Sequence, residues 1–260
     1  MNYWTKLSID FANQSNYLDE LFQVYSTIPE GIRDIDSEKW TNIENAFNEQ
    51  DNYLLIKELL KLDLFPLKDS YIAYLKQDNT SINRNPQTIN RICGRLYEMG
   101  LTKIFEKCSE PKETNRQIGP MFGNWLKKKS IGLEPVSIDE FLNTNINAIL
   151  GGTDVDKMNF AKRHLNYNRN KGLDLVARFN GKYVIGEAKF LSSDGGSQNS
   201  DFEDAISTIE SKDTNAIKVA ILDGILYIPS NKKMHKFITN PYKDYNIMSS
   251  LVLRDFLYQL

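Results

Sequence analysis

Two acidic residues in the second half of the chain have the types and spacing to bind a metal ion. Asp174 and Glu187 flank the dipeptide Asn180-Gly181, which strongly favours a two-residue hairpin turn between strands. This turn pairs Phe179 with Lys182, and the same register places Asp174 opposite Glu187. Directly opposite residues have Cβ atoms about 4.5–5.5 Å apart on one face of a sheet. Two carboxylates this close repel each other unless a cation lies between them.

A lysine extends this acidic pair. Lys189 lies two residues beyond Glu187, so it shares that face of the strand. Mg²⁺ prefers carboxylate and carbonyl oxygens, and the carbonyl of Ala188 could be a further ligand. Lys189 could then hold or deprotonate a water molecule that attacks a phosphorus atom. The simpler alternative is a solvated Glu–Lys ladder, which does not explain why Asp174 faces Glu187 in an otherwise apolar hairpin.

The segment from Asp174 through twelve residues to Glu187-Ala188-Lys189 resembles the PD-(D/E)xK motif of type II restriction endonucleases, although Leu173 stands where the motif has proline. The resemblance implies that Asp174 and Glu187 bind Mg²⁺ and that Lys189 is the catalytic lysine. It also implies sequence-specific cleavage of double-stranded DNA to 5′-phosphate and 3′-hydroxyl ends, by a homodimer whose genetic partner is a DNA methyltransferase. Many members add an acidic residue from the helix before the hairpin, for which Glu134 and Glu140 are candidates beside Asp154 and Asp156.

Several polar and basic residues are candidate DNA contacts, because Lys and Arg bind phosphates while Gln and Asn can read base edges. Each could equally be an ordinary solvated side chain. The candidates are Arg116, Gln117, Asn124, Lys127, Lys162, Arg163, Arg169, Lys171, Ser197, Gln198 and Asn199.

Charge is distributed unevenly along this chain of 260 residues, whose formal net charge is only −2. Residues 157–189 hold 8 Lys/Arg against 2 Asp/Glu, whereas residues 1–70 hold 6 against 13. The basic segment could bind a polyanion. The chain has only two histidines, which argues against a His-rich metallohydrolase. It has only two cysteines and no apparent N-terminal leader sequence, and both features favour a cytoplasmic protein. No phosphate-binding or dinucleotide-binding loop is present.

The spacing of apolar residues predicts mainly helices in the first 150 residues and both helices and strands afterwards. Expected helices cover 53–63, 66–77, 86–99, 114–129, 137–150, 153–167, 202–209 and 249–260. Strands are expected at 173–179 and 182–190, and a second hairpin at 217–222 and 225–228 through Asp223-Gly224. Residues 192–200 are expected to form a polar loop.

These elements predict a mixed α/β (α+β) fold with a restriction-endonuclease-like core, in which helices flank a central mixed sheet. The expected regions are a helical N-terminal part, residues 1–112, for DNA recognition or dimerisation, and a catalytic core, residues 113–260. Two alternatives remain open. One is a repair or structure-specific nuclease of the same fold. The other is a non-enzymatic DNA-binding regulator that uses the helix at 86–99, although a core helix would have the same pattern.

Overall fold

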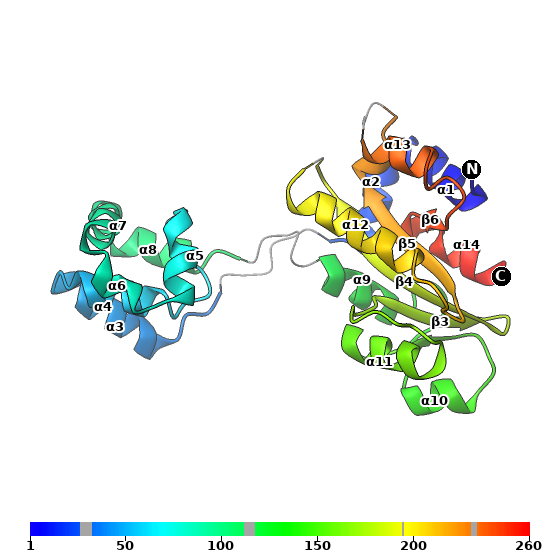
Figure 1. The fold of residues 1–260 in the computed structure, drawn as a ribbon, viewed down its shortest axis with the longest axis horizontal. Helices are drawn as coiled ribbons and strands as arrows, with labels where there is room; N and C mark the ends of the chain where they lie inside the picture. The colour runs from blue at the N-terminus through cyan, green and yellow to red at the C-terminus, as the bar shows by residue number, and fades with distance from the viewer. Residues whose placement is uncertain (27–32, 112–117, 194, 230–232) are drawn as a thin grey trace. The chain divides into compact units, whose positions relative to one another are not determined.

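The computed structural model describes residues 1–26, 33–111, 118–193, 195–229 and 233–260 (Figure 1). The chain forms two compact units. The helical unit comprises Ile28–Glu113, and the sheet unit combines Met1–Thr27 with Thr114–Leu260. This division differs from the boundary expected after residue 112, because the first 27 residues belong with the C-terminal part of the chain.

The helical unit has its own apolar core, which includes Ile43, Leu55, Ile92, Leu96 and Ile104. The helix expected at 86–99 forms with the expected bounds. It begins with Pro86 and ends before Gly100, which adopts a φ of +78°. The helix expected from residue 66 begins only at residue 70. The helices are α3 (Ser37–Asn48), α4 (Asn52–Leu59), α5 (Ser70–Gln77), α6 (Ser81–Arg84), α7 (Pro86–Met99) and α8 (Leu101–Cys108).

The sheet unit is built on a six-stranded sheet whose strands follow one another in sequence order. Only β3 runs antiparallel to its neighbours, so the sheet is mixed, as expected. The strands are β1 (Pro135–Val136), β2 (Ala148–Leu150), β3 (Leu175–Phe179), β4 (Lys182–Leu191), β5 (Ile217–Gly224) and β6 (Ile247–Met248).

Helices cover both faces of this sheet. They are α1 (Tyr3–Ala12), α2 (Tyr17–Val24), α9 (Ile118–Lys127), α10 (Ile138–Asn143), α11 (Asp154–His164), α12 (Ser197–Ile209), α13 (Met234–Thr239) and α14 (Leu253–Tyr258), with 3-10 turns η2 (Ile225–Tyr227) and η3 (Ser250–Val252). No helix in the described ranges has both the length and the apolar character that crossing a bilayer requires.

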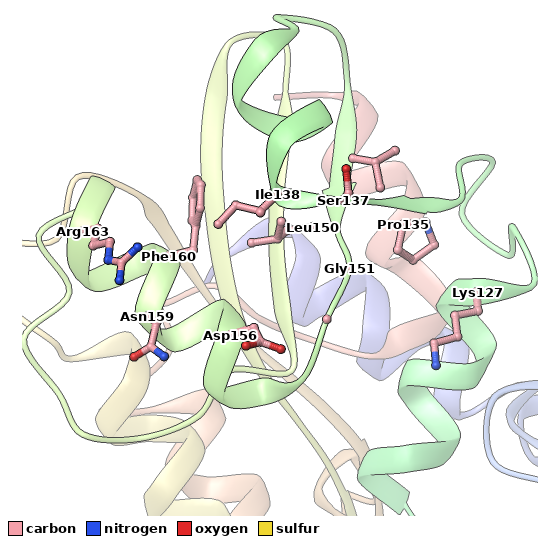
Figure 2. Close-up of a pocket in the computed structure, with 12 residues that line it drawn as sticks. Lys127, Pro135, Ser137, Ile138, Leu150, Gly151, Asp156, Asn159, Phe160 and Arg163 are labelled. Atoms are coloured by element: carbon pink, nitrogen blue, oxygen red, sulfur yellow. The ribbon is translucent and has the colours of Figure 1, made fainter.

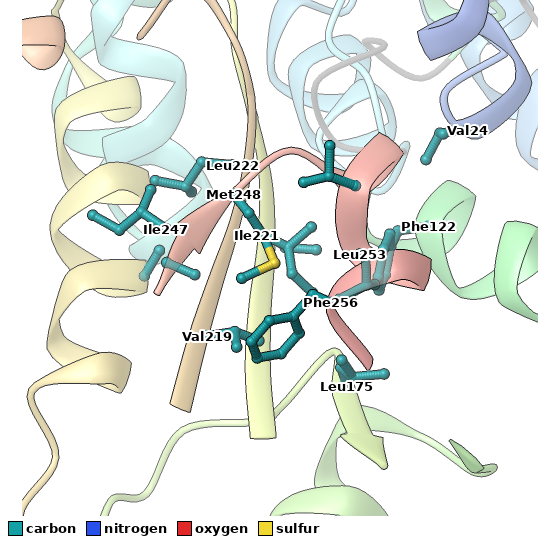
Figure 3. Close-up of a cluster of buried hydrophobic side chains, with 14 of the residues drawn as sticks. Val24, Phe122, Leu175, Val219, Ile221, Leu222, Ile247, Met248, Leu253 and Phe256 are labelled. Atoms are coloured by element: carbon teal, nitrogen blue, oxygen red, sulfur yellow. The ribbon is translucent and has the colours of Figure 1, made fainter. Parts of the chain in front are cut away.

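The two faces have different cores because side chains alternate along each strand. Leu175 and Ile221 belong to the core that also contains Phe122 of α9 and Phe256 of α14 (Figure 3). Val176 and Ile185 point to the opposite face, where they share a second core with Phe141 of α10 and Phe160 of α11. Asp174 and Glu187 are in phase with this second set.

Three of the expected elements are wrong. The helix expected over 137–150 ends at Asn143, and residues 148–150 form β2. The hairpin expected at Asp223-Gly224 does not form, because β5 continues through both residues and pairs in parallel with β4 and β6. The polar loop expected over 192–200 ends early, since α12 begins at Ser197.

Candidate active site

The hairpin of β3 and β4 has the expected register. Asn180 and Gly181 adopt φ values of +50° and +76°, as a tight two-residue turn requires. The pairing runs from Phe179 with Lys182 to Leu175 with Gly186. Asp174 lies directly before β3, and its N–H donates to the carbonyl of Gly186 at 3.1 Å. The hairpin therefore positions Asp174 beside the part of β4 that carries Glu187.

Asp174 is almost fully buried and held through several of its polar atoms. Its side chain is 8% exposed. Its Oδ2 accepts a hydrogen bond from the backbone N–H of Ala188 at 2.7 Å, and its carbonyl oxygen accepts one from Nζ of Lys157 at 2.9 Å. No described residue donates a hydrogen bond to Oδ1, which leaves that oxygen available as a ligand.

Glu187 and Lys189 form an ion pair on the face of β4 that Asp174 shares. The Lys189 Nζ lies 2.8 Å from Glu187 Oε1, and the Glu187 side chain is only 3% exposed. A second ammonium, on Lys171, lies 3.8 Å from the same oxygen and 2.7 Å from Oδ2 of Asp204 on α12. The three residues predicted to act together are thus brought together.

Burial and mutual repulsion dominate the electrostatics of the site. Burial, and then the nearby charge of Glu187, raise the pKa of Asp174 to about 7. Burial alone would lower the pKa of Lys189, but the Glu187 carboxylate beside it outweighs this effect, and the pKa of Lys189 is raised. A cation bound between the two carboxylates would relieve the repulsion between them.

The oxygen atoms at this site fit a hard divalent cation. In an extended strand, the N–H and C=O of one residue point to the same side. The N–H of Ala188 donates to Asp174, so its carbonyl points toward the same side. The described residues contain no cluster of three or more His, Cys, Asp or Glu side chains that could hold a metal. Two carboxylates and one carbonyl leave the remaining positions to water, which is how Mg²⁺ is usually bound in proteins.

Two of the acidic residues suggested to supplement this pair have other contacts, whereas a third acts on Asp174. Glu134 forms a salt bridge with Lys129 at 3.0 Å, and Glu140 lies in the first turn of α10, where its backbone N–H donates to Ser137. Asp154, at the start of α11, is the helix acid whose charge acts on Asp174. The N-cap of α11 is the preceding residue, Thr153.

The suggested DNA contacts fall into three groups. Arg116 and Gln117 lie outside the described residues, as does the side chain of Ser197. A second group is engaged within the protein. Lys162 bonds to Asn170, Arg169 to Thr208, Lys171 to Asp204, and the buried Gln198 accepts from the N–H of Ser192. The third group is more open: Asn124, Lys127 and Arg163 are exposed, and Asn199 is partly so.

Two of the exposed basic residues line one pocket of ≈ 570 Å³ (Figure 2). Lys127, at the end of α9, and Arg163, on α11, contribute to its rim, with Asn159 and Asp156 between them. Apolar residues from β1 and β2 complete the lining. The pocket lies past the carboxyl end of β2, and Asp174 lies directly before the antiparallel β3. Pocket and carboxylate pair therefore open at the same edge of the sheet.

Lys157 lies in the basic segment of residues 157–189, which could bind a polyanion, yet the structure buries it. Its side chain is 8% exposed and lies 3.6 Å from Asp154 Oδ1. The helical spacing of α11 gives no signal of this contact, because it depends on how the helix packs against the segment before β3. Gly119 of α9 is a second residue whose proximity to the site the sequence pattern did not predict. A Cβ at that position would lie 3.9 Å from Asp174 Oδ1.

Neither the curated proteins nor the solved structures contain a match to this chain. A sequence model of one protein family, described as the Tsp45I type II restriction enzyme, matches residues 2–260. That match spans both the helical unit and the sheet unit, including the hairpin that carries the carboxylate pair. The chain therefore belongs to the Tsp45I type II restriction enzyme family.

Proposed function

We propose that this protein cleaves double-stranded DNA at a specific sequence by Mg²⁺-dependent hydrolysis, with Asp174, Glu187 and Lys189 as its catalytic site. Family membership makes it a site-specific endonuclease that binds DNA. The observation that carries the finer proposal is the burial of Asp174 and Glu187 at one end of a hairpin, with Lys189 Nζ 2.8 Å from Glu187. This arrangement is the one expected of the PD-(D/E)xK motif.

Each residue has a distinct part in the proposed reaction. Asp174 and Glu187 hold the metal ion together with the carbonyl of Ala188. Bound there, Mg²⁺ supplies Lewis-acid polarisation of the phosphoryl oxygen and stabilises the leaving oxyanion. Lys189 holds the attacking water against the phosphate. The water oxygen bonds to phosphorus as the bond to the 3′ oxygen breaks. The attacking water releases a proton to solvent, and the 3′ oxygen takes up a proton from solvent. The ends are then a 5′-phosphate and a 3′-hydroxyl.

We also propose that the duplex runs along the sheet edge that holds both the carboxylate pair and the pocket of Figure 2. Lys127 and Arg163 are exposed there, and neither has an acidic partner within salt-bridge distance among the described residues. Both are therefore available to contact phosphates on either side of the cleaved bond, which would fix the position of the duplex without reading its sequence.

A homodimer suits this function, because cutting both strands of a two-fold symmetric site matches a two-fold protein. A cell that holds such an enzyme in its cytoplasm must protect its own sites. We therefore expect a cognate DNA methyltransferase as its genetic partner.

The direct test is to incubate the protein with phage DNA in Mg²⁺ or in EDTA and to sequence the fragment ends. We expect discrete fragments in Mg²⁺ only, with one common sequence at every cut and 5′-phosphate ends. Cutting confined to junctions, flaps or mismatches would instead indicate a repair nuclease. Sequence-specific binding without any cleavage in Mg²⁺ would indicate a DNA-binding regulator.

A further inference from the structure

The buried lysine of α11 has no role in the proposed chemistry, yet it contacts a catalytic residue. Lys157 donates to the backbone carbonyl of Asp174 at 2.9 Å, and its side chain is 8% exposed. Burying an ammonium costs free energy unless it gains strong partners. We infer that Lys157 is a positioning residue that fixes Asp174 for metal binding through the backbone, an inference that rests on the proposed function.

The contact belongs to a clamp between the start of α11 and the segment before β3. The N–H of Leu173 donates to the carbonyl of Asp154 at 3.1 Å. A Cβ on Gly172 would lie 2.9 Å from the Cβ of Asp154, so only glycine permits this close approach. With Lys157 added, three consecutive residues are held against one helical turn. The backbone leading into Asp174 consequently has little freedom to shift.

Three hydrogen bonds anchor Asp174 and leave one of its carboxylate oxygens free. The N–H of Asp174 donates to Gly186, its carbonyl accepts from Lys157, and its Oδ2 accepts from Ala188. Only Oδ1 receives no hydrogen bond from a described residue. Removing the Lys157 bond releases one of three anchors and leaves a buried carbonyl without its donor. Partners that orient metal ligands typically contribute about 10- to 100-fold in metal affinity.

Burial argues against the competing role of Lys157 as a phosphate contact. A side chain that binds DNA must reach the surface, and on the same helix Arg163 does so while Lys157 does not. A phosphate contact would also contribute to the salt dependence of DNA binding, by a slope of about 0.9 per contact. The two roles therefore predict different measurements.

The test compares Lys157→Met with Lys162→Met, which removes a lysine from the same helix that bonds to Asn170 instead. Mn²⁺, which accepts the same oxygen ligands as Mg²⁺, serves as the probe in paramagnetic resonance titrations of the full chain. We expect Lys157→Met to weaken Mn²⁺ binding by about 10-fold or more, with metal-free DNA affinity and its salt slope unchanged. Lys162→Met should bind Mn²⁺ as wild type does.

Thermal unfolding of each variant separates loss of fold from loss of metal binding. If Lys157→Met does not fold, Lys157→Gln replaces it. Glutamine stays polar, but its side chain is one bond shorter than that of lysine and does not reach the Asp174 carbonyl that Lys157 contacts at 2.9 Å, so the same weakening of Mn²⁺ binding is expected. Wild-type Mn²⁺ affinity in a folded Lys157 variant would overturn the inference, as would a reduced salt slope for DNA binding. Neither outcome touches the proposed function, which is tested separately by Mg²⁺-dependent, sequence-specific cleavage by the wild-type protein.

Discussion

At the scale of single residues, the candidate site shows what side-chain alternation can and cannot reveal. Asp174 and Glu187 could be paired from sequence because a tight turn fixes the register and the side-chain period of two fixes the face. The contacts of Lys157 and Lys171 could not be predicted. They depend on helices that approach the sheet from distant parts of the chain, and no local pattern records that approach.

The two cysteines allow a test of burial at this scale. Cys93 and Cys108 are buried in the helical unit, and burial raises the pKa of each thiol to about 12. The reactive thiolate is therefore scarce near neutral pH. We expect no reaction of the native protein with Ellman's reagent at pH 8 and release of two thiols per chain after unfolding in guanidinium chloride. Rapid reaction of the native protein would contradict the burial of these residues.

At the scale of elements, two similar turn signals had opposite outcomes. Asn180-Gly181 forms the expected hairpin, whereas Asp223-Gly224 lies at the end of β5. The difference is tertiary, since the next strand in sequence, β6, pairs with β5 in parallel, and a parallel pair is joined by a crossover rather than a turn. The short apolar run at 146–150 was mistaken for helix for a related reason. Periodicity alone cannot distinguish a short buried strand from a helix end.

Substitution by alanine should cost different amounts of folding free energy at Gly181 and at Gly224. A Cβ on Gly224 would lie 2.1 Å from the carbonyl oxygen of Leu191, whereas a Cβ on Gly181 meets nothing within 4 Å. Both residues have positive φ. Gly181→Ala should therefore lower the free energy of unfolding by about 1 kcal/mol through backbone strain alone, and Gly224→Ala by about 3 kcal/mol or more through added overlap. Urea unfolding of both variants measures this difference, and equal losses would contradict the described path of β5.

At the scale of the whole molecule, the first 27 residues belong with the sheet unit because of a buried polar network. Asp223, fully buried on β5, accepts hydrogen bonds from Tyr25 at 3.0 Å and from the N–H of Ser250 at 3.2 Å. It also accepts from the hydroxyl of Ser249 and, at 3.5 Å, from the hydroxyl of Tyr17. The Tyr17 oxygen in turn accepts from the N–H of Gly224 at 3.0 Å. Sequence composition predicted a helical first half, but it could not show that these first helices pack on the sheet formed more than a hundred residues later.

The assignment of the active site is tested most directly by forming the protein–DNA complex without metal, adding Mg²⁺, and following cleavage in a single turnover. Asp174→Asn, Glu187→Gln and Lys189→Met should each slow cutting by about 1,000-fold or more, since each removes a group from the reacting centre, while DNA affinity is retained. Lys182→Met is the matched control, because Lys182 lies on the same strand but at its other end. The predicted result is that cleavage is lost in the three site variants and retained in Lys182→Met. Wild-type cutting by any one of them would contradict the assignment of the active site.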